Sequence, residues 1–593
     1  MAAKSEEENV IIIGIDFGTT FSGVSWAWSG QPMDIEVISK WESKLGRNSD
    51  KEKTPTAMIF KGKRGEVSWG YGLAPDGKQE PLKWFKLLLV DDEDLPTSIR
   101  ESSQVAAARR LVKDANKDPV EVISCYLRHL WNHAIECIAK SGGADLVKMC
   151  KFHIVITLPA IWPVYARQRM QRAADDAGLL EDRPAGPTTL SFITEPEAAA
   201  LAMMRDQGRR PNIQAITSWS AMLEVVLSTC SYEIISKEPF SVREAVQGDG
   251  DLCGGVFLDE SFIDKLKEKV TPQAWDNVPE AEARKALNND WENNIKTSFV
   301  GEDEDFYFGL PAECRAPGSS QRGVKRKKNL MFDLNDLTEV FDPVVNRTTK
   351  LVKKQIDSVL RKTGRNPKKV ILVGGFGRSD YLRIRLQKEI GHATEVLQSS
   401  GNRPWSAISR GAVIQGLTQR SLAPGLSVNI KSRVSRMSYG VAYLTGFVQG
   451  KHAKKYKCWS EEEQVWKAVS QMAWFLEKGT DISTAKPVVR EFYRLYDTPP
   501  KKIEETIYAT SSWPAPNEQN EDVKELCTIS WTKKINIHSL PRYTNPLGKV
   551  FSQLDYNVDM NCSGGTVDFS VVHDGKQLGT KNVQVVFKEE DEL

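Results

Sequence analysis

The segment GIDFGTT places an aspartate at the end of an apolar run, directly before a glycine and two threonines. Asp16 supplies a carboxylate, which suits a hydrated magnesium ion. Backbone N–H groups in such a turn suit phosphate oxygens, as do the hydroxyls of Thr19 and Thr20. Gly18 permits backbone angles and a close approach that a side chain would block. The pattern indicates phosphate chemistry, although an ordinary hairpin is the alternative reading.

Two further turns carry candidate ligand residues. In ILVGGFGRSDYL, Gly374 and Gly375 follow an apolar run and let a flat ligand lie against the backbone. The guanidinium group of Arg378 in the same segment can stack on an adenine ring. In FITEPEAAALA, Glu195 precedes Pro196, where its carboxylate can orient water or magnesium, or simply cap the next helix. Each turn alone is typical of many strand-to-helix connections.

The elements that must position these residues alternate between strands and helices. VIIIGIDF and KFHIVITL have the apolar continuity of buried strands, whereas ARQRMQRAADDAGL and RPWSAISRGAVIQGL have helical spacing. This alternation predicts α/β layers, and a length of 593 residues predicts several domains. After about residue 421, alternating strand patterns dominate. Ser460 and Glu463 have capping-box spacing there, which predicts one amphipathic helix in a β-rich C-terminal domain.

Composition excludes several classes of function. The net charge of +2 gives no general electrostatic case for nucleic acid or a membrane surface, and no apolar run is long enough to span a bilayer. Nine scattered cysteines without a C-x-x-C pair indicate neither a zinc site nor a disulfide framework. The acidic N-terminus lacks the basic start of a signal peptide. We therefore expect a cytoplasmic protein, and VKRKK leaves nuclear import open.

The order of the motifs is more specific than any one of them. D-F-G-T-T comes first, then LPA with TEPEAAALA, then GDGDLCGG, VGGFGRS and AISRGAVIQGL. This succession resembles the actin-like ATPase superfamily and, within it, the 70-kDa heat-shock chaperone family. It is most similar to a divergent, shorter branch with a truncated C-terminal part. The resemblance covers about residues 9–420 and implies a two-lobed, ribonuclease H-like α/β fold with ATP and Mg²⁺ in the cleft between the lobes.

The resemblance also implies a division of the chain and roles for its residues. The expected parts are lobe I at 9–205, lobe II at 206–390, a closing helix returning to lobe I at 391–420, and the β-rich domain at 421–593. Asp16 would hold magnesium through waters, and Glu195 would order the hydrolytic water. The β- and γ-phosphates would lie on Gly18, Thr19 and Thr20.

The resemblance extends to a catalytic lysine and to the adenosine. KWFKLLL is similar to the family segment that carries this lysine, with Lys86 the first choice and Lys83 the second. The ammonium group at the end of a flexible lysine side chain can stay close to the γ-phosphate while it is transferred. The expected adenosine contacts are Glu292 and Lys296 in WENNIKTSF, together with Gly374, Gly375 and Arg378.

The implied function is a heat-shock-70-like ATP-binding protein, with slow hydrolysis coupled to client proteins and co-chaperones. Two departures put classical peptide binding and tail docking in doubt. The C-terminal region has no room for a long helical lid, and the chain ends in EEDEL where cytosolic members have EEVD. A nonenzymatic pseudo-ATPase scaffold is the competing class. A sugar or polyol kinase of the same superfamily is a third, without an acceptor-site motif and with TEPEAAALA against it.

One expected motif is missing. In this family a second phosphate hairpin, D-x-G-G-G-T-x-D, follows the TEPEAAALA helix, and it is due at Ala221 to Ser228. The sequence there is AMLEVVLS, so the length is kept and the chemistry is lost. GGTVD at Gly564 to Asp568 lies after the adenosine motif, on the wrong side of the chain order, and continues into a hairpin strand of its own.

The genetic code offers an explanation. Suitable codons for residues 214–230, read from the third base of the first codon, translate as GDNFLVSDAGGGTVDL, which contains the complete motif. In that frame the protein sequence dictates the two later bases of each codon. We hypothesise that Gln214 to Cys230 is an out-of-frame reading; the alternative is a true pseudo-ATPase that has lost its loop. We expect ATP hydrolysis if the loop is present, and weak or no activity from the present sequence.

Overall fold

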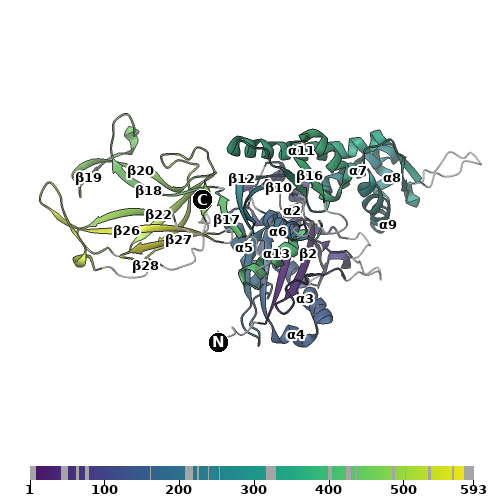
Figure 1. Ribbon diagram of the computed structural model, residues 1–593, viewed down its shortest axis with the longest axis horizontal. Coiled ribbons are helices and arrows are strands. Elements are labelled where there is room, and N and C mark those ends of the chain that lie inside the picture. The colour runs from purple at the N-terminus through teal and green to yellow at the C-terminus, as the bar shows by residue number, and fades with distance from the viewer. Residues whose placement is uncertain are drawn as a thin grey trace, which may run out of the picture. The chain divides into compact units, whose positions relative to one another are not determined.

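The computed structural model forms two compact units, and its first unit contains the residues expected to bind nucleotide (Figure 1). That unit comprises residues 1–241 and 248–429, and the second comprises 242–247 and 430–593. The structure describes residues 9–41, 51–61, 66–73, 79–95, 97–159, 162–207, 218–222, 226–237, 240–252, 254–314, 329–398, 404–422, 429–435, 437–483, 488–500, 502–531, 536–563 and 566–579. Within these ranges, every helix is too short or too polar to cross a membrane.

The first half of unit 1 is built on a sheet with strand order β3-β2-β1-β8-β9, to which β4 adds by pairing with β2. β1 is antiparallel to β2 and parallel to β8, which is parallel to β9. The strands are β1 (Val10–Phe17), β2 (Phe21–Trp28), β3 (Glu36–Val37), β4 (Thr54–Pro55), β8 (Lys151–Leu158) and β9 (Thr189–Thr194), beside a small sheet of β5 (Ala57–Lys61), β6 (Glu66–Trp69) and β7 (Leu82–Lys83). The helices are α1 (Thr97–Arg100), α2 (Ser103–Asp114), α3 (Pro119–Gly142), α4 (Ala144–Met149), α5 (Val164–Asp176) and α6 (Glu195–Gln207).

The second half of unit 1 repeats this sheet pattern. Its order is β16-β15-β10-β11-β12, with β10 antiparallel to β11 and parallel to β15, and β15 parallel to β16. Beyond β12 the same sheet continues with β17 (Asn429–Val434) and β21 (Asp481–Ser483), which are antiparallel to each other. The strands are β10 (Ser218–Met222), β11 (Val226–Lys237), β12 (Phe240–Leu252), β15 (Lys369–Leu372) and β16 (Glu395–Gln398), with a separate hairpin of β13 (Phe306–Gly309) and β14 (Asn329–Phe332). The helices are α7 (Gly255–Val270), α8 (Pro272–Asp276), α9 (Glu280–Ala286), the π-helix η5 (Leu287–Ile295), α10 (Lys296–Ser298), α11 (Leu334–Thr363), α12 (Asp380–Ile390) and α13 (Ala407–Gln419).

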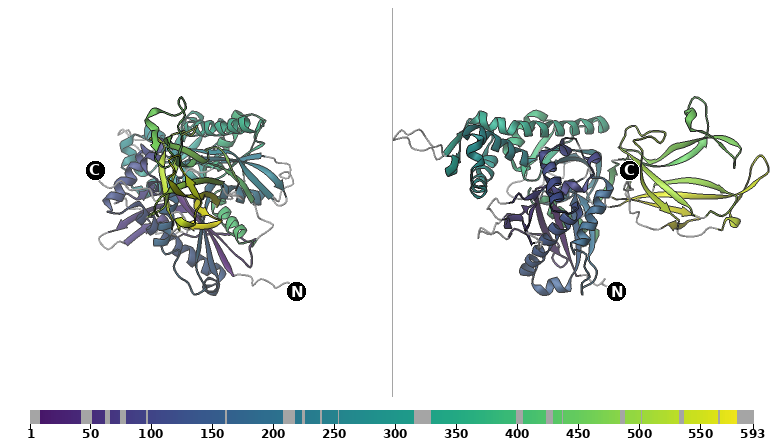
Figure 2. Two further views of the ribbon diagram at one scale, coloured as in Figure 1. Left: turned by 90° about the vertical axis from the view of Figure 1, so that its left-hand side faces the viewer. Right: turned by 180° about the vertical axis from the view of Figure 1, so that it is seen from behind.

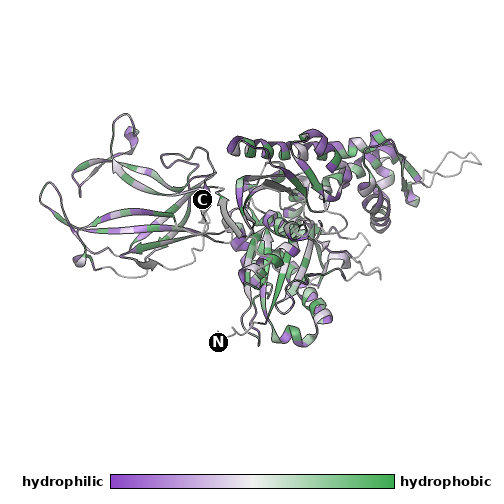
Figure 3. Cartoon of the chain, viewed as in Figure 1, coloured by the Kyte–Doolittle hydropathy of each residue, from purple (hydrophilic) through white to green (hydrophobic). Residues whose placement is uncertain are grey.

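Each half of unit 1 has an apolar core of its own. The central strand β1 is buried along its whole length, as its run of valine and isoleucine predicts. In the second half, Phe262 stacks on Trp291 with 4.0 Å between the ring centroids, and α11 turns its buried face to the same core (Figure 3). In the right-hand view of Figure 2, the teal helices of the second half lie above the purple strands of the first half.

Helix α13 closes the first sheet. It packs on β1 and α6, where glycines allow the backbones to touch. A Cβ atom on Gly14 would lie 2.3 Å from the Ser409 carbonyl oxygen, and one on Gly411 would lie 1.7 Å from the Ala198 carbonyl oxygen. Arg410 adds a two-pronged ion pair to Asp206, with both N–O distances at 2.9 Å. These contacts fix the strand that delivers Asp16 and the helix that begins at Glu195.

The described part of unit 2 from residue 430 onward consists of strands and two short 3₁₀ helices, Lys454–Tyr456 and Ile537–Ser539. Two antiparallel sheets have the orders β19-β20-β18-β23-β24 and β22-β26-β27-β28, the second with β25 beside β26. Tyr439 and Phe475 of the first sheet meet Phe492 and Phe569 of the second, so the sheets pack face to face. The strands are β17 (Asn429–Val434), β18 (Ser438–Gly446), β19 (Lys457–Ser460), β20 (Val465–Leu476), β21 (Asp481–Ser483), β22 (Val488–Tyr496), β23 (Glu504–Thr510), β24 (Lys524–Ser530), β25 (Arg542–Thr544), β26 (Val550–Ser563), β27 (Thr566–His573) and β28 (Lys576–Gly579).

The amphipathic helix predicted at Ser460 is wrong. Ser460 ends β19, and four turn residues lead directly into β20. The hydroxyl of Ser460 does accept a hydrogen bond from the Glu463 N–H group, at 3.2 Å. This local bond forms in a tight turn as well as at a helix start. The following residues are rich in valine and aromatic side chains, which favour a strand, and β20 has partners on both sides.

We expect Gly411→Ala to destabilise unit 1. Overpacking typically costs about 1–3 kcal/mol, and the clashing Ala198 carbonyl is helix backbone that cannot swing aside. This cost exceeds the roughly 1 kcal/mol that alanine gains over glycine inside a helix. Chemical denaturation of the full-length variants measures the effect. Gly72→Ala is the matched control, because a Cβ atom there meets nothing within 4 Å. Equal stability of the two variants would contradict the proposed close packing.

Candidate nucleotide site

The first glycine turn lies between β1 and β2 and is held by the segment around β4. Thr56 donates from its hydroxyl to the Gly18 carbonyl at 2.8 Å and from its N–H group to the Thr20 carbonyl at 2.7 Å. A Cβ atom on Gly18 would lie 2.1 Å from the Phe21 carbonyl oxygen, so this tight turn requires glycine. Thr19 is buried. The turn is therefore rigid before any ligand arrives.

Lys86 and Glu195 meet next to this turn. Lys86 lies in the short 3₁₀ helix Phe85–Leu89, is 1% exposed, and donates to Glu195 Oε1 at 2.7 Å. Its ammonium group also lies 5.7 Å from the centre of the Phe17 ring, in β1. Lys83, the second choice from the sequence, is exposed on β7. The structure thus brings Lys86, and not Lys83, to Glu195.

Glu195 is the first residue of α6, but it does not cap the helix. The capping box is made by its neighbours: the Glu197 N–H group donates to the Thr194 hydroxyl at 3.4 Å, and the Thr194 N–H group donates to the Glu197 carboxylate at 3.5 Å. The Glu195 carboxylate is left to face Lys86. Burial raises its pKa above the ordinary value, Asp16 adds to the rise, and Lys86 opposes it. Of the two readings that the sequence left open, the cap belongs to Thr194 and Glu197.

The structure adds a residue that the sequence analysis missed. Lys53, directly before β4, forms an ion pair with Asp16, with 2.9 Å between Nζ and Oδ2. Both side chains are almost fully buried, at 1% and 2% exposure. The contact is electrostatic, because Oδ2 lacks the geometry of an accepted hydrogen bond. No spacing or motif in KEKTPT distinguishes Lys53 from a solvated lysine, so only the fold could reveal it.

The segment of the missing phosphate motif is also a hairpin. β10 and β11 take the same place in the second sheet that β1 and β2 take in the first, and Met222 pairs with Thr229 at the end of the described ladder. The position predicted for the motif, Ala221 to Ser228, therefore coincides with the connection of this hairpin. Residues 223–225 lie outside the described residues. The GGTVD segment belongs instead to the β26–β27 hairpin of unit 2, with residues 564–565 outside the description.

The expected adenosine residues form a charged group in the second half of unit 1. Lys296 donates to Glu292 at 2.8 Å and to Asp259 at 2.7 Å. Burial lowers the Lys296 pKa, but the two carboxylates more than compensate, so it lies above its ordinary value. In the chain, Lys51 belongs to the same KEK run as Lys53. Burial lowers the pKa of Lys51, with Glu292 opposing and Lys296 and Arg378 adding to the shift.

The glycines expected beside adenosine form the turn after β15. Gly374 has φ of +81°, which favours glycine, and its N–H group donates to the Pro404 carbonyl at 3.0 Å. Gly375 directly precedes the 3₁₀ turn Phe376–Arg378, and Phe376 is buried in the second core. A Cβ atom on Gly255 would lie 3.5 Å from Lys296 Nζ and 3.6 Å from Phe376 Cβ, so this turn and Lys296 meet at the start of α7.

The donor set suits phosphate better than a divalent cation. Lys53 and Lys86 carry two positive charges and Asp16 and Glu195 two negative ones, and each carboxylate is already paired. Mg²⁺ is normally held by one or two carboxylates together with waters and phosphate oxygens. Here the lysine partners neutralise both carboxylates that could serve it. Among the described residues, no three histidine, cysteine, aspartate or glutamate side chains gather as metal ligands. The magnesium ion expected at Asp16 does not fit this arrangement.

Known proteins are similar in sequence to this chain over most of its length. Heat shock 70 kDa protein 12A of Mus musculus is 26% identical over 76% of this chain and 74% of its own length. Heat shock 70 kDa protein 12B of Homo sapiens is also 26% identical, over 74% and 72%. Chaperone protein DnaK of Thermus thermophilus is 25% identical over 68% and 60%.

The chain is similar in sequence to proteins of the heat-shock-70 family. The likeness supports an ATP-binding protein, and the fold is the two-lobed, actin-like ATPase fold with a β-rich C-terminal region. The repeated sheets of unit 1 are the cores of the two lobes. Residues 433–568 match a family described as a domain of unknown function, DUF8568. This match covers the face-to-face sheets of unit 2 up to the start of β27, and β28 lies beyond it.

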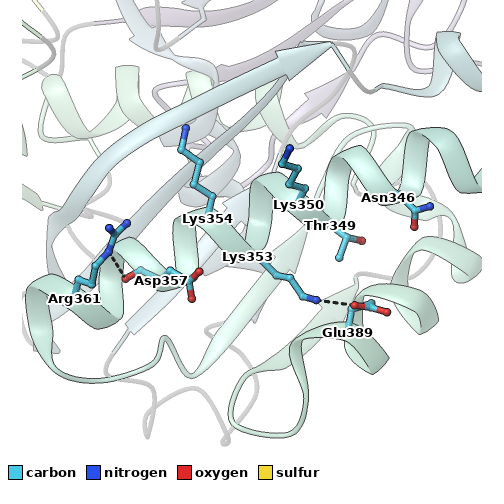
Figure 4. Close-up of a pocket in the computed structure, with 8 residues that line it drawn as sticks. All are labelled: Asn346, Thr349, Lys350, Lys353, Lys354, Asp357, Arg361 and Glu389. Atoms are coloured by element: carbon cyan, nitrogen blue, oxygen red, sulfur yellow. Dashed lines mark hydrogen bonds and ion pairs between the residues drawn. The ribbon is translucent and has the colours of Figure 1, made fainter. Parts of the chain in front are cut away.

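A separate hollow lies outside this site. It has a volume of about 500 Å³ and runs along α11 toward Glu389 of α12 (Figure 4). Lys353 pairs there with Glu389 at 2.6 Å, and Arg361 donates to the backbone carbonyl of Asp357 at 3.3 Å. The hollow shares no residue with the charged groups described above.

We expect Lys86→Met to lower stability in a pH-dependent way. Because the pKa of Glu195 is raised in the folded state, its ionisation destabilises the fold progressively as pH rises above its ordinary value of 4.5. Lys86 offsets this penalty. Without it, the stability deficit relative to the parent should be small near about pH 5 and approach about 3–5 kcal/mol near about pH 8.

Denaturant titrations across that pH range give the deficit. Adding Glu195→Gln to Lys86→Met should remove its pH dependence, and Lys83→Met should stay within about 0.5 kcal/mol of the parent throughout. A deficit for Lys86→Met that does not change with pH would show that the buried pair is not as described.

Proposed function

We propose that the intact protein binds ATP between the two lobes of unit 1 and hydrolyses it slowly. The observation that carries the proposal is the buried group of Asp16, Lys53, Lys86 and Glu195 beside the Gly18 turn. Burying charged side chains costs free energy, and buried ionisable groups with shifted pKa values cluster at functional sites. Two ammonium groups there can neutralise phosphate oxygens, and the N–H groups and hydroxyls of the turn add uncharged donors.

The roles follow from these positions. Lys86 would stabilise charge on the γ-phosphate, and Glu195, held by Lys86, would orient the attacking water. Thr19 and Thr20 would contact the β- and γ-phosphates from a turn that Thr56 keeps rigid. Arg378 and the charged group of Glu292 and Lys296 would contact the adenosine, with Gly374 and Gly375 allowing its close approach.

The β-rich unit supports a second role in binding client or partner proteins. Trp459 and Trp466 of its β19–β20 hairpin are 41% and 50% exposed, and their rings pack edge to face at 5.1 Å. Exposed tryptophans are enriched in protein interfaces. We propose that ATP turnover in unit 1 is coupled to partner binding by this unit, as in a chaperone. A cytoplasmic location stays a prediction.

A pseudo-ATPase scaffold is the competing function for the present sequence. It is favoured by Leu223, Glu224 and Val225, which stand where the family has three glycines. In the shifted reading frame the glycine codons straddle residues 223–226, between β10 and the paired Thr229. The backbone pairing of this hairpin does not depend on glycines, so it is compatible with both alternatives.

Sequencing the transcript across codons 214–230 distinguishes the two. We expect reads in which the shifted frame is translated, because the agreement of two later bases per codon with the motif is unlikely to arise by codon choice alone. Reads that encode AMLEVVLS in frame with both flanking segments would establish a genuine loss of the loop.

Calorimetric titration with ATP tests the chemistry itself. The present sequence should bind about a hundredfold to ten-thousandfold more weakly than a full-length variant with Asp-Ala-Gly-Gly-Gly-Thr-Val-Asp at 221–228. Two lost N–H donors to phosphate at about 1.5–3 kcal/mol each account for this range. A second variant with alanine at the three glycine positions should recover only part of the affinity. Equal affinity of all three proteins would mean that the motif has been misplaced.

A further inference from the structure

The ion pair between Lys53 and Asp16 is a built feature of the fold. Asp16 faces Gly23 across the β1–β2 ladder. A Cβ atom on Gly23 would lie only 3.0 Å from Lys53 Cγ, so the missing side chain leaves the path that the lysine stem follows. A larger residue at Gly23 would displace the stem. The strand pairing and the lysine are therefore matched to each other.

The backbone of Lys53 is fixed just as firmly. Thr54, the next residue, pairs with Ser22 of β2, and the Ser22 and Thr56 hydroxyls lie 2.8 Å apart. Thr56 in turn holds the carbonyls of the phosphate turn. Lys53 is thus part of the same rigid assembly as Gly18 to Thr20. It reaches Asp16 from a position that the turn itself determines.

The charge balance indicates what the lysine does there. A divalent cation beside Asp16 would bring two positive charges to a group whose two carboxylates are each neutralised by an ammonium. At short range in a poorly solvated site, repulsion from Lys53 would oppose that cation. A phosphate chain meets the opposite situation. An ammonium carries three N–H donors, so it can contact a carboxylate and a phosphate oxygen at the same time.

We propose that Lys53 takes the place of a divalent cation beside Asp16, so that this site binds the phosphates of ATP without magnesium. The inference rests on the proposed function, because it assumes that ATP binds between the lobes. It gives Asp16 a different task from the expected one. The carboxylate positions the lysine, and the lysine meets the phosphate.

The test is the ratio of ATP dissociation constants in excess EDTA and in excess Mg²⁺. It is measured by calorimetry on the full-length protein carrying the glycine hairpin at 221–228. For the parent we expect the two constants to agree within about threefold. For Lys53→Met the constant in EDTA should rise at least about tenfold, because one charged hydrogen bond to phosphate is lost. Mg²⁺ should then restore most of the affinity, since Asp16 is free to hold the hydrated ion.

Two further variants test whether the effect is specific to Lys53 and Asp16. Lys51→Met removes a lysine two positions away, near the adenosine residues, and should weaken binding equally in EDTA and Mg²⁺. Asp16→Asn combined with Lys53→Met removes both charges and avoids an unpaired buried carboxylate, so it guards against misfolding of the single variant. It should bind weakly in EDTA, and Mg²⁺ should not restore binding because the carboxylate is gone.

The outcomes separate the two proposals. ATP binding by the parent only when Mg²⁺ is present would overturn the role of Lys53 and leave the proposed function standing. No ATP binding in either condition would overturn the proposed function itself. A ratio that Lys53→Met and the double variant both leave unchanged would also overturn the inference.

Discussion

Neutralising buried charge is the constraint on which the first half of unit 1 depends. Four ionisable side chains lie beside one glycine turn, and an unpaired charge in such surroundings costs several kcal/mol. The chain solves this with two ion pairs, Lys53 with Asp16 and Lys86 with Glu195. The four residues come from segments far apart in the sequence. Their pairing therefore ties the β1 strand, the β4 segment, the 3₁₀ helix and helix α6 into one arrangement.

The close backbone approaches in this half of unit 1 serve that arrangement. Gly14 and Gly411 let α13 lie against β1 and α6, so the strand that ends near Asp16 and the helix that begins at Glu195 are held by a common neighbour. Gly23 makes room for the stem of Lys53. These glycines carry no chemistry, yet a side chain at any of them would shift a charged partner. The ion pairs therefore depend on close backbone packing.

The sequence identified candidate site residues where a chemically suitable side chain lies next to a recognisable strand end or turn. The Asp16 turn and Glu195 each lie at a strand end, and a strand followed by glycine or by a proline-containing helix start can be recognised from a few residues. The choice between Lys86 and Lys83 rested on a resemblance, and the structure separates them by burial. Lys53 could not be found, because its partner is distant along the chain and nothing in KEKTPT marks it. The helix expected at Ser460 failed because a serine hydroxyl accepts the same local hydrogen bond in a turn.

The second lobe shows why a lost phosphate loop need not disturb the fold. β10 is placed by backbone pairing to β15 on one side and β11 on the other, and β11 continues well past the connection. AMLEVVLS is apolar and contains valine, so it is compatible with strands on both sides of a turn. The fold specifies that a hairpin exists there, whereas only the glycines would specify that its N–H groups can reach a phosphate. Binding would then depend on the first lobe alone, where Lys53 and Lys86 supply the positive charge.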